Sequence, residues 1–299
     1  MNLGKSRKKK NKVNNKKTHR SRMNCHPGIK GKTASNNTCY TTIHLDKIKK
    51  AYNINNPSNL INGDSSDSII NGLRSKLKCK KEDCWLNQLN EKDRKMIDEE
   101  VFAPDHPDNW NSNPTEWLSN YDILSVLQQY EKTVKEFKFI GPTPIDFNSR
   151  KGNSCIWPEL CNIQLGKFIS NKINKIGIIF NLDKHNEAGS HWVSMFIDIK
   201  EGVIFYFDSA ASKEPIEITN LINLLLQQAS KLNIRMKYVT NYPKQHQIGN
   251  TECGMYSLYF IITMLDNKKS INTKIKLFKT KTITDKFVQA FRKEYFNTK

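Results

Sequence analysis

The sequence contains no apolar run that approaches the roughly 20 residues a transmembrane helix requires. The basic N-terminal residues are not followed by an apolar stretch either, so we expect no secretory signal peptide. Apolar residues make up only 37% of the 299 positions, which is little for a chain that folds throughout. We therefore predict one large domain with an appendage, a tail and loops, and no association with membranes.

Acidic residues are missing from residues 1–45, which carry twelve Lys or Arg. The net charge of the chain is +19, so 19 − 12 leaves +7 for residues 46–299. The basic core, Lys5 to Arg22, has almost no apolar side chains and cannot offset the entropy cost of ordering. We predict a disordered basic tail over residues 1–35. It would bind nucleic acid weakly, act in nuclear import, or simply keep the protein soluble.

Cysteine is scarce: the seven residues are an odd number and are irregularly spaced. Without an export signal, this pattern favours reduced thiols over a disulfide framework. Cys79 and Cys84 could supply half of a zinc site, but structural zinc sites usually show two tight pairs. Upstream residues that could complete such a site are Cys25, His26, Cys39 and His44. We predict no metal or other cofactor, and buried or half-buried free thiols.

Hydrophobic periodicity divides the rest of the chain. Residues 36–110 are polar with helical spacing, and a Pro/Asn-rich stretch over residues 103–114 indicates a domain boundary. We predict a helical N-terminal arm at 36–112 and a main domain at 113–299. Predicted helices cover residues 68–78, 85–102, 115–134, 214–232 and 254–265, and predicted strands cover residues 175–182, 193–199, 203–207 and 235–241.

The last third of the chain contains the residue types that a thiol nucleophile requires. Cys253 stands at the start of a buried helix, where unpaired N–H groups and the helix dipole favour a thiolate. His191 precedes one predicted strand and Asp208 follows the next, with a hairpin turn predicted at Glu201-Gly202. The two side chains should therefore emerge at the same sheet edge. His191 would then be a base with one ring nitrogen held by Asp208.

A donor for the oxyanion is the remaining requirement. Gln247 lies in a loop six residues before Cys253, so its amide could donate beside the backbone N–H of Cys253. Gly254 leaves no side chain to crowd that position. Gln245 is a second candidate, although the six-residue spacing favours Gln247. Singly, a core thiol, a solvated histidine and a turn aspartate all have structural explanations, but their combination in this order favours catalysis.

This combination, written HW…D…Q-x5-C-G, resembles the family of ubiquitin-like-protein proteases. The family includes the SUMO proteases, the adenovirus protease and the polyprotein proteases of large DNA viruses. Trp117-Leu118 resembles the segment that opens the catalytic domain in SUMO proteases, with Ser119 as a departure from that pattern. His191 to Asp198, Thr251 to Gly254 and the Cys79/Cys84 pair resemble the large-DNA-virus branch, such as the African swine fever virus protease.

The resemblance implies an α+β fold, with a mixed central β-sheet flanked by helices, in the catalytic domain at 113–299. It implies that Cys253 is the nucleophile, His191 the general base, Asp208 its orienter and Gln247 the oxyanion donor. Trp192 and Trp117 would line a narrow tunnel, which explains why relatives cleave after Gly-Gly or Ala-Gly. Core packing is the alternative explanation for Trp117.

The leading functional hypothesis is therefore a thiol endopeptidase that matures viral capsid or core polyproteins in the virion and the host cytoplasm. The alternative is an isopeptidase that removes ubiquitin-like modifiers, since both activities use the same tunnel. An acetyltransferase of the same fold and a non-catalytic, polyanion-binding virion protein remain less favoured. The sequence predicts protein substrates as the main partners, and it leaves open whether nucleic acid activates the enzyme.

Overall fold

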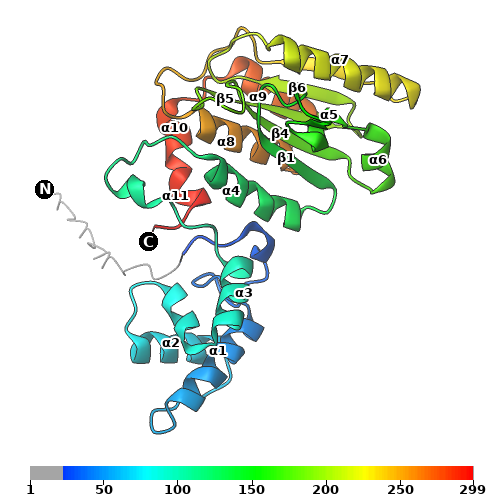
Figure 1. Ribbon diagram of the computed structural model, residues 1–299. Coiled ribbons are helices and arrows are strands. Elements are labelled where there is room, and N and C mark those ends of the chain that lie inside the picture. The colour runs from blue at the N-terminus through cyan, green and yellow to red at the C-terminus, as the bar shows by residue number, and fades with distance from the viewer. Residues whose placement is uncertain (1–22, 299) are drawn as a thin grey trace, which may run out of the picture.

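The computed structural model describes residues 23–298 and consists of a helical arm below a larger α+β domain (Figure 1). The larger domain is built on a five-stranded sheet in the order β1-β4-β5-β6-β7. The strands are β1 (Phe137–Pro144), β4 (Lys175–Asn181), β5 (Trp192–Asp198), β6 (Val203–Phe207) and β7 (Lys237–Thr240). The two outer pairs are parallel and the central pairs antiparallel, so the sheet is mixed and the predicted fold class is confirmed.

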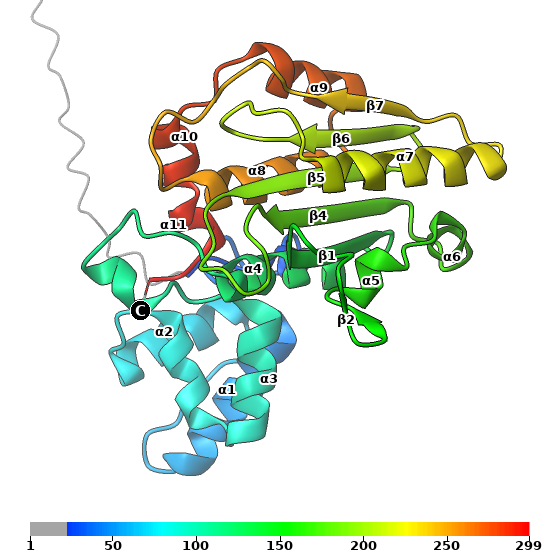
Figure 2. The same ribbon diagram turned by 45° about the horizontal axis from the view of Figure 1, so that its top comes forward.

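Both faces of the sheet are covered, because the central strands are buried at every position. Along β5, Phe196 contributes to the core on the side of α8 (Cys253–Leu265), whereas Met195 and Ile197 contribute to the core beneath α7 (Ile216–Lys231). Figure 2 shows the strands of this sheet side by side in the order β1-β4-β5-β6-β7, with α7 and α8 on opposite faces. A strand buried on both faces shows a continuous apolar run rather than an alternation, as residues 203–207 do, and residues 193–197 follow this pattern except at the buried Ser194.

Helix α8 is apolar nearly all round because it lies inside the larger core. The remaining helices of this domain are α4 (Asn120–Thr133), α5 (Pro158–Cys161), α6 (Leu165–Ser170), α9 (Ile271–Thr280), α10 (Asp285–Ala290) and α11 (Arg292–Tyr295). A short hairpin of β2 (Arg150–Lys151) and β3 (Ser154–Cys155) stands apart from the main sheet. No helix in the part of the chain that the structure describes is long and apolar enough to cross a membrane.

The predicted hairpin turn between β5 and β6 is confirmed by their antiparallel pairing. Gly202 in this turn has a φ of +66°, and a Cβ there would lie 2.3 Å from the carbonyl oxygen of Arg235. A larger residue would therefore be strained by its backbone and would clash with the chain that leads into β7. The turn thus depends on glycine, and it fixes the register in which β5 and β6 pair.

The arm consists of α1 (Thr42–Asn55), α2 (Ser66–Leu77), α3 (Glu91–Val101) and short 3-10 turns. The single helix predicted over residues 85–102 is wrong: a 3-10 turn, Glu82–Gln88, is followed by a break and then α3. The physical reason is Asn90, whose side chain accepts a hydrogen bond from the backbone N–H of Asp93 and caps α3.

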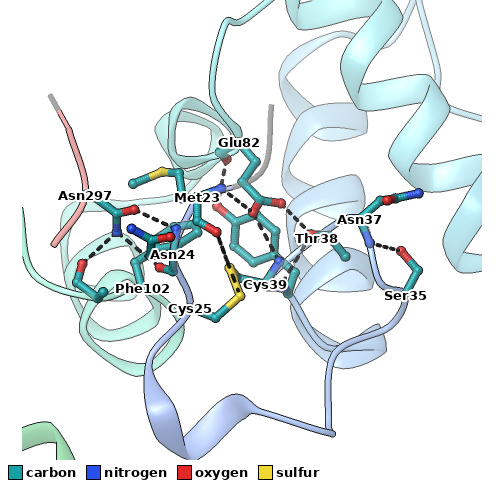
Figure 3. Close-up of a disulfide and its surroundings, with 12 residues drawn as sticks. Met23, Asn24, Cys25, Ser35, Asn37, Thr38, Cys39, Glu82, Phe102 and Asn297 are labelled. Atoms are coloured by element: carbon teal, nitrogen blue, oxygen red, sulfur yellow. Dashed lines mark hydrogen bonds between the residues drawn. A yellow bond between two sulfur atoms is a disulfide. The ribbon is translucent and has the colours of Figure 1, made fainter. Parts of the chain in front are cut away.

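A buried carboxylate joins the segments of the arm (Figure 3). The Glu82 side chain is fully buried and accepts hydrogen bonds from the backbone N–H groups of Met23 and Cys39 and from the Thr38 hydroxyl. The Tyr40 hydroxyl donates to the carbonyl oxygen of Glu82 at 2.8 Å. Burying a carboxylate is tolerable only when its lone pairs are satisfied in this way. Glu82 therefore holds residues that precede α1 against the turn that follows α2.

The prediction of a disordered tail up to residue 35 is wrong for residues 23–35. Met23 and Ile29 are buried, and a 3-10 turn forms at Pro27–Ile29. The Asn24 backbone N–H donates to the Asn297 side chain at 2.7 Å. The composition of this stretch is basic, but Met23 packs in the core of the arm and Asn24 forms hydrogen bonds with the C-terminal segment. Residues 1–22, which hold the basic core, lie outside the described part.

The prediction of reduced thiols is also wrong for six of the seven cysteines. The structure has three disulfides, Cys25–Cys39, Cys79–Cys84 and Cys155–Cys161, with Cα–Cα distances of 5.2, 6.3 and 6.4 Å. These separations lie in the range that a disulfide spans. Sequence spacing did not reveal the pairs, because the turn at Pro27–Ile29 is what brings the first pair together. Cys253 is the free cysteine of the described residues.

Truncation should distinguish the two parts of the N-terminal segment. Removing residues 1–22 should leave the melting temperature and small-peptide turnover nearly unchanged. Removing residues 1–33 should lower the free energy of unfolding by about 2–5 kcal/mol, because buried apolar side chains and the Cys25–Cys39 disulfide are lost. Differential scanning calorimetry of both truncated proteins checks this. Equal melting temperatures would show that residues 23–33 contribute nothing to the fold.

Candidate active site

The pairing of β5 with β6 brings His191 and Asp208 together. His191 directly precedes β5 and Asp208 directly follows β6, and because the strands are antiparallel these two ends share one sheet edge. The His191 Nε2 atom lies 2.7 Å from Oδ1 of Asp208. The sequence predicted this meeting from the hairpin, and the structure places the two side chains as expected.

Asp208 is fully buried, and its carboxylate is fixed from several directions. The backbone N–H groups of Ala210 and Ser212 donate to Oδ1 and Oδ2 at 2.9 and 3.0 Å. Asn241 adds two bonds to the Asp208 backbone: its Oδ1 accepts from the Asp208 N–H, and its Nδ2 donates to the Asp208 carbonyl oxygen. Sequence reasoning missed Asn241, which follows β7 and is visible only once β7 is known to lie beside β6.

Cys253 is the first residue of α8 and is 1% exposed. Its side chain forms a hydrogen bond with that of His191. Because Asp208 occupies Nε2, the nitrogen that remains for the thiol is Nδ1. Burial lowers the pKa of His191, but the Asp208 hydrogen bond and the Cys253 side chain outweigh it and raise that pKa to about 10. The His191 ring is therefore protonated at neutral pH and lies beside the Cys253 side chain.

A buried ion pair precedes the nucleophile. Both side chains of Glu252 and Arg292 are 4% exposed, and Nε and Nη2 of Arg292 lie 3.2 and 3.1 Å from Oε2 of Glu252. The guanidinium of Arg292 also lies 4.4 Å from the ring centroid of Trp110. Breaking such a pair would leave an uncompensated buried charge beside Cys253. Sequence reasoning missed this pair, because the two residues are forty positions apart.

Gln247 lies in the loop that leads to α8 and is 5% exposed. Its Oε1 accepts a hydrogen bond from the Ser209 hydroxyl at 2.7 Å, and its Nε2 donates to the carbonyl oxygen of Gly249 at 2.8 Å. Gln245 is exposed, and its Nε2 donates to the carbonyl oxygen of Gln247 at 2.8 Å. The fixed, buried amide is therefore that of Gln247 and not that of Gln245.

Trp192 is 4% exposed, and its Nε1 donates to the carbonyl oxygen of Leu118 at 3.0 Å. Trp117, which precedes Leu118 in the sequence, is 36% exposed. The structure explains the glycine at position 254 by close packing and not by an uncrowded oxyanion position. A Cβ on residue 254 would lie 2.9 Å from Cβ of Leu118. Leu118 thus contacts both the nucleophile helix and Trp192, and sequence reasoning did not single out its role.

A groove of about 340 Å³ lies beside Trp192. Its lining includes Asn120, Pro142, Trp157, Asn181, Gly189 and Trp192. Asn120 begins α4, Pro142 lies in β1, Asn181 ends β4 and Trp192 begins β5. Trp157 and Gly189 lie in connecting segments. No group of three or more His, Cys, Asp or Glu side chains among residues 23–298 is arranged to hold a metal ion.

Comparisons with known proteins agree with this arrangement. The model of the Ulp1 protease family, C-terminal catalytic domain, matches residues 165–299, which include His191, Asp208, Gln247 and Cys253. A protein of Acanthamoeba polyphaga mimivirus that carries the name of a thiol protease is 32% identical over 259 residues, 78% of this chain and 82% of that relative. A cysteine protease of African swine fever virus is 32% identical over 199 residues, 62% of this chain and 69% of that relative.

A solved structure shows the same fold across both parts of the chain. The crystal structure of an African swine fever virus protease matches with a TM-score of 0.64 at 22% identity and covers 92% of this chain and 96% of that one. The fold, the free cysteine beside a histidine and the sequence relatives define a cysteine protease. The chain belongs to the Ulp1 protease family, and the resemblance and enzyme class predicted from the sequence are confirmed.

Alkylation should test the pairing of His191 with Cys253. Without reductant, iodoacetamide should label Cys253 alone, and as readily at pH 6 as at pH 7, because a His191 pKa of about 10 keeps the imidazolium charge at both values. Asp208→Asn removes a partner that raises the pKa of His191, so labelling at pH 7 should slow by about tenfold or more. Mass spectrometry of the labelled peptides gives the rates.

The matched control is Asp198→Asn, which alters a buried aspartate at the opposite end of the same strand pair. That variant should be labelled at the wild-type rate. Equal slowing in both variants would show that Asp208 acts through general stability and not through His191.

Proposed function

We propose that this chain is a thiol endopeptidase that cleaves after glycine in small-residue motifs and matures viral capsid or core polyproteins. The observation that carries the proposal is the single free cysteine of the described residues, placed against a histidine that an aspartate holds. The comparisons support the viral setting, because the sequence relatives come from large DNA viruses.

The proposed mechanism uses four side chains. The Cys253 thiolate attacks the substrate carbonyl carbon, and the His191 imidazolium gives its proton to the departing amine. The oxyanion that forms accepts hydrogen bonds from the Cys253 backbone N–H, which has no partner within its helix, and from the Gln247 amide. Water then attacks the thioester, with neutral His191 taking its proton. Asp208 keeps the imidazole oriented in both halves of the reaction.

The proposed preference for glycine follows from burial at the site. Cys253 is 1% exposed and Trp192 4% exposed, with Trp192 tied to the Leu118 carbonyl oxygen. A substrate that reaches the sulfur must pass this indole, and a residue without a side chain needs the least space. In this proposal Trp117, on the adjoining exposed segment, forms the outer part of the tunnel.

Removal of a ubiquitin-like modifier is the second candidate. Relatives from other African swine fever virus isolates are named SUMO-1 cysteine proteases. A glycine-selective tunnel would serve this reaction as well. Incubation with SUMO conjugates and, separately, with proteins of the source particle would decide between the two, with new termini mapped by mass spectrometry and Cys253→Ala as the inactive control.

Two further proposals concern location and partners. Since the substrates would be particle proteins, the enzyme would act in the virion and in the host cytoplasm where particles assemble. The basic residues between Lys5 and Arg22 would bind nucleic acid weakly through phosphate contacts. A lower affinity for DNA or RNA, with a shallower salt dependence, after removal of residues 1–22 would support this role.

The oxyanion role of Gln247 predicts a selective kinetic defect. Gln247→Ala should lower kcat by a factor on the order of 10² and leave KM nearly unchanged, because an oxyanion donor acts on the transition state. Steady-state kinetics on a glycine-containing peptide measures both constants. Gln245→Ala is the control and should keep wild-type turnover. The opposite pattern, with Gln245→Ala inactive, would assign the donor to Gln245.

Substrate selection predicts a narrow cleavage motif. In a peptide library varied at the two positions before the cut, products should end in glycine preceded by a small residue, because Trp192 restricts the space there. Sequencing of the products reveals the motif, and Cys253→Ala shows the background. Efficient cleavage after Leu, Phe or Arg would contradict the tunnel.

A further inference from the structure

The loop that carries Gln247 is anchored to one carboxylate outside the four side chains of the proposed mechanism. Asp285, the first residue of α10, accepts a hydrogen bond from the backbone N–H of Gly249 at 2.8 Å through Oδ2. The same oxygen lies 3.2 Å from the backbone nitrogen of Ile248. Two consecutive backbone groups, directly after Gln247, therefore donate to one side chain.

The same carboxylate contacts the nucleophile helix. Tyr256 lies on α8, one turn after Cys253, and its hydroxyl is 2.9 Å from Oδ1 of Asp285. Tyr256 is fully buried, and burial followed by the hydrogen bond to Asp285 raises its pKa, so the phenol keeps its proton. The hydroxyl shares this proton between Asp285 and the carbonyl oxygen of Ile283, which lies 2.8 Å away. Asp285 thus joins the Gln247 loop to the helix that begins with the nucleophile.

The orientation of the Gln247 amide depends on this anchor. A carbonyl oxygen can only accept, so the atom of Gln247 next to the Gly249 carbonyl must be the NH₂ nitrogen. The opposite atom is then Oε1, to which the Ser209 hydroxyl donates. One N–H of the amide is used by Gly249, and the second remains for an oxyanion. If Gly249 moves, the acceptor that fixes this orientation moves with it.

The Ser209 carbonyl oxygen holds the backbone N–H groups of His246 and Gln247, whereas the residues that follow Gln247 face solvent. Ile248 is 89% exposed, and Gly249 and Asn250 are exposed as well. Hydrogen bonds to a charged carboxylate are about twice as strong as neutral ones, which suits an anchor for a solvent-facing loop. His246, the residue before Gln247, is fixed by its ring, whose Nε2 lies 2.8 Å from the carbonyl oxygen of Phe278.

We infer that Asp285, supported by Tyr256, is a positioning residue that fixes the Gly249 carbonyl and thereby aims the Gln247 amide at the oxyanion. The inference rests on the proposed oxyanion role of Gln247. Asp285 does not touch the substrate in this scheme. It acts through the loop, so its loss should affect the stability of the transition state and not the binding of the ground state.

The test is Asp285→Asn, which keeps the side-chain volume and removes the charge and one acceptor. It should lower kcat roughly tenfold, with KM within about twofold of wild type. The inflections of the pH profile of kcat/KM should stay in place, because His191 and Asp208 are untouched. Asp67→Asn, at an exposed first turn of α2, is the matched control and should have wild-type kinetics.

A double-mutant cycle separates positioning from a general structural effect. In a Gln247→Ala background, Asp285→Asn should change kcat by less than about twofold, since the amide it aims is already gone. The same tenfold loss in both backgrounds would overturn the inference. Tyr256→Phe, which removes one donor to Asp285, provides a second cycle with the same expected coupling and serves if Asp285→Asn fails to fold.

The cycle also separates this inference from the proposed function. Impaired Gln247→Ala together with fully active Asp285→Asn would overturn the role of Asp285 alone. Fully active Gln247→Ala would overturn the oxyanion role of Gln247 and this inference with it. Cleavage that persists in Cys253→Ala would overturn the proposed chemistry as a whole.

Discussion

The antiparallel pairing of β5 with β6 is the interaction on which the site depends. It places the residue before one strand and the residue after the next at the same edge, which is where His191 meets Asp208. The pairing is held in register by the turn at Gly202, since no side chain fits against the Arg235 carbonyl oxygen. A slip of one residue would turn His191 away and move the buried apolar side chains to the wrong faces.

The nucleophile is positioned by a second element, which packs against this hairpin. Helix α8 is buried along its length, so its first residue, Cys253, has little freedom to move relative to the sheet. Leu118 packs against Gly254 and receives the Trp192 indole hydrogen bond, so the segment before α4 is attached to both halves of the site. Strand edge, buried helix and covering segment therefore meet around Cys253 and Trp192.

The sequence predicted the parts of the site that local pattern determines. Strand hydrophobicity and the turn at Gly202 predicted four of the five strands and the placement of His191 and Asp208, and the apolar run after Cys253 predicted α8, but β1 was missed. It could not predict partners that meet only through tertiary packing. Asn241, Arg292 and Asp285 are ordinary polar residues in sequence, and their roles appear once β7, α10 and α11 are in place. The disulfides were missed for a different reason: the odd number of cysteines and the lack of an export signal favoured reduced thiols, although two of the pairs are only five and six positions apart.

Asn24, in the segment that leads into the arm, forms hydrogen bonds with residues near the C-terminal end of the chain. Asn24 and Asn297 are 273 positions apart, yet they exchange hydrogen bonds, and Asn297 also donates to the Ala103 carbonyl oxygen. During synthesis Glu252 and Cys253 are added before Arg292. The Glu252 carboxylate therefore lacks its partner until Arg292 is in place. Changes near Arg292 and Asn297 would therefore reach two distant places at once, the buried carboxylate beside Cys253 and the contacts of Asn24 in the arm.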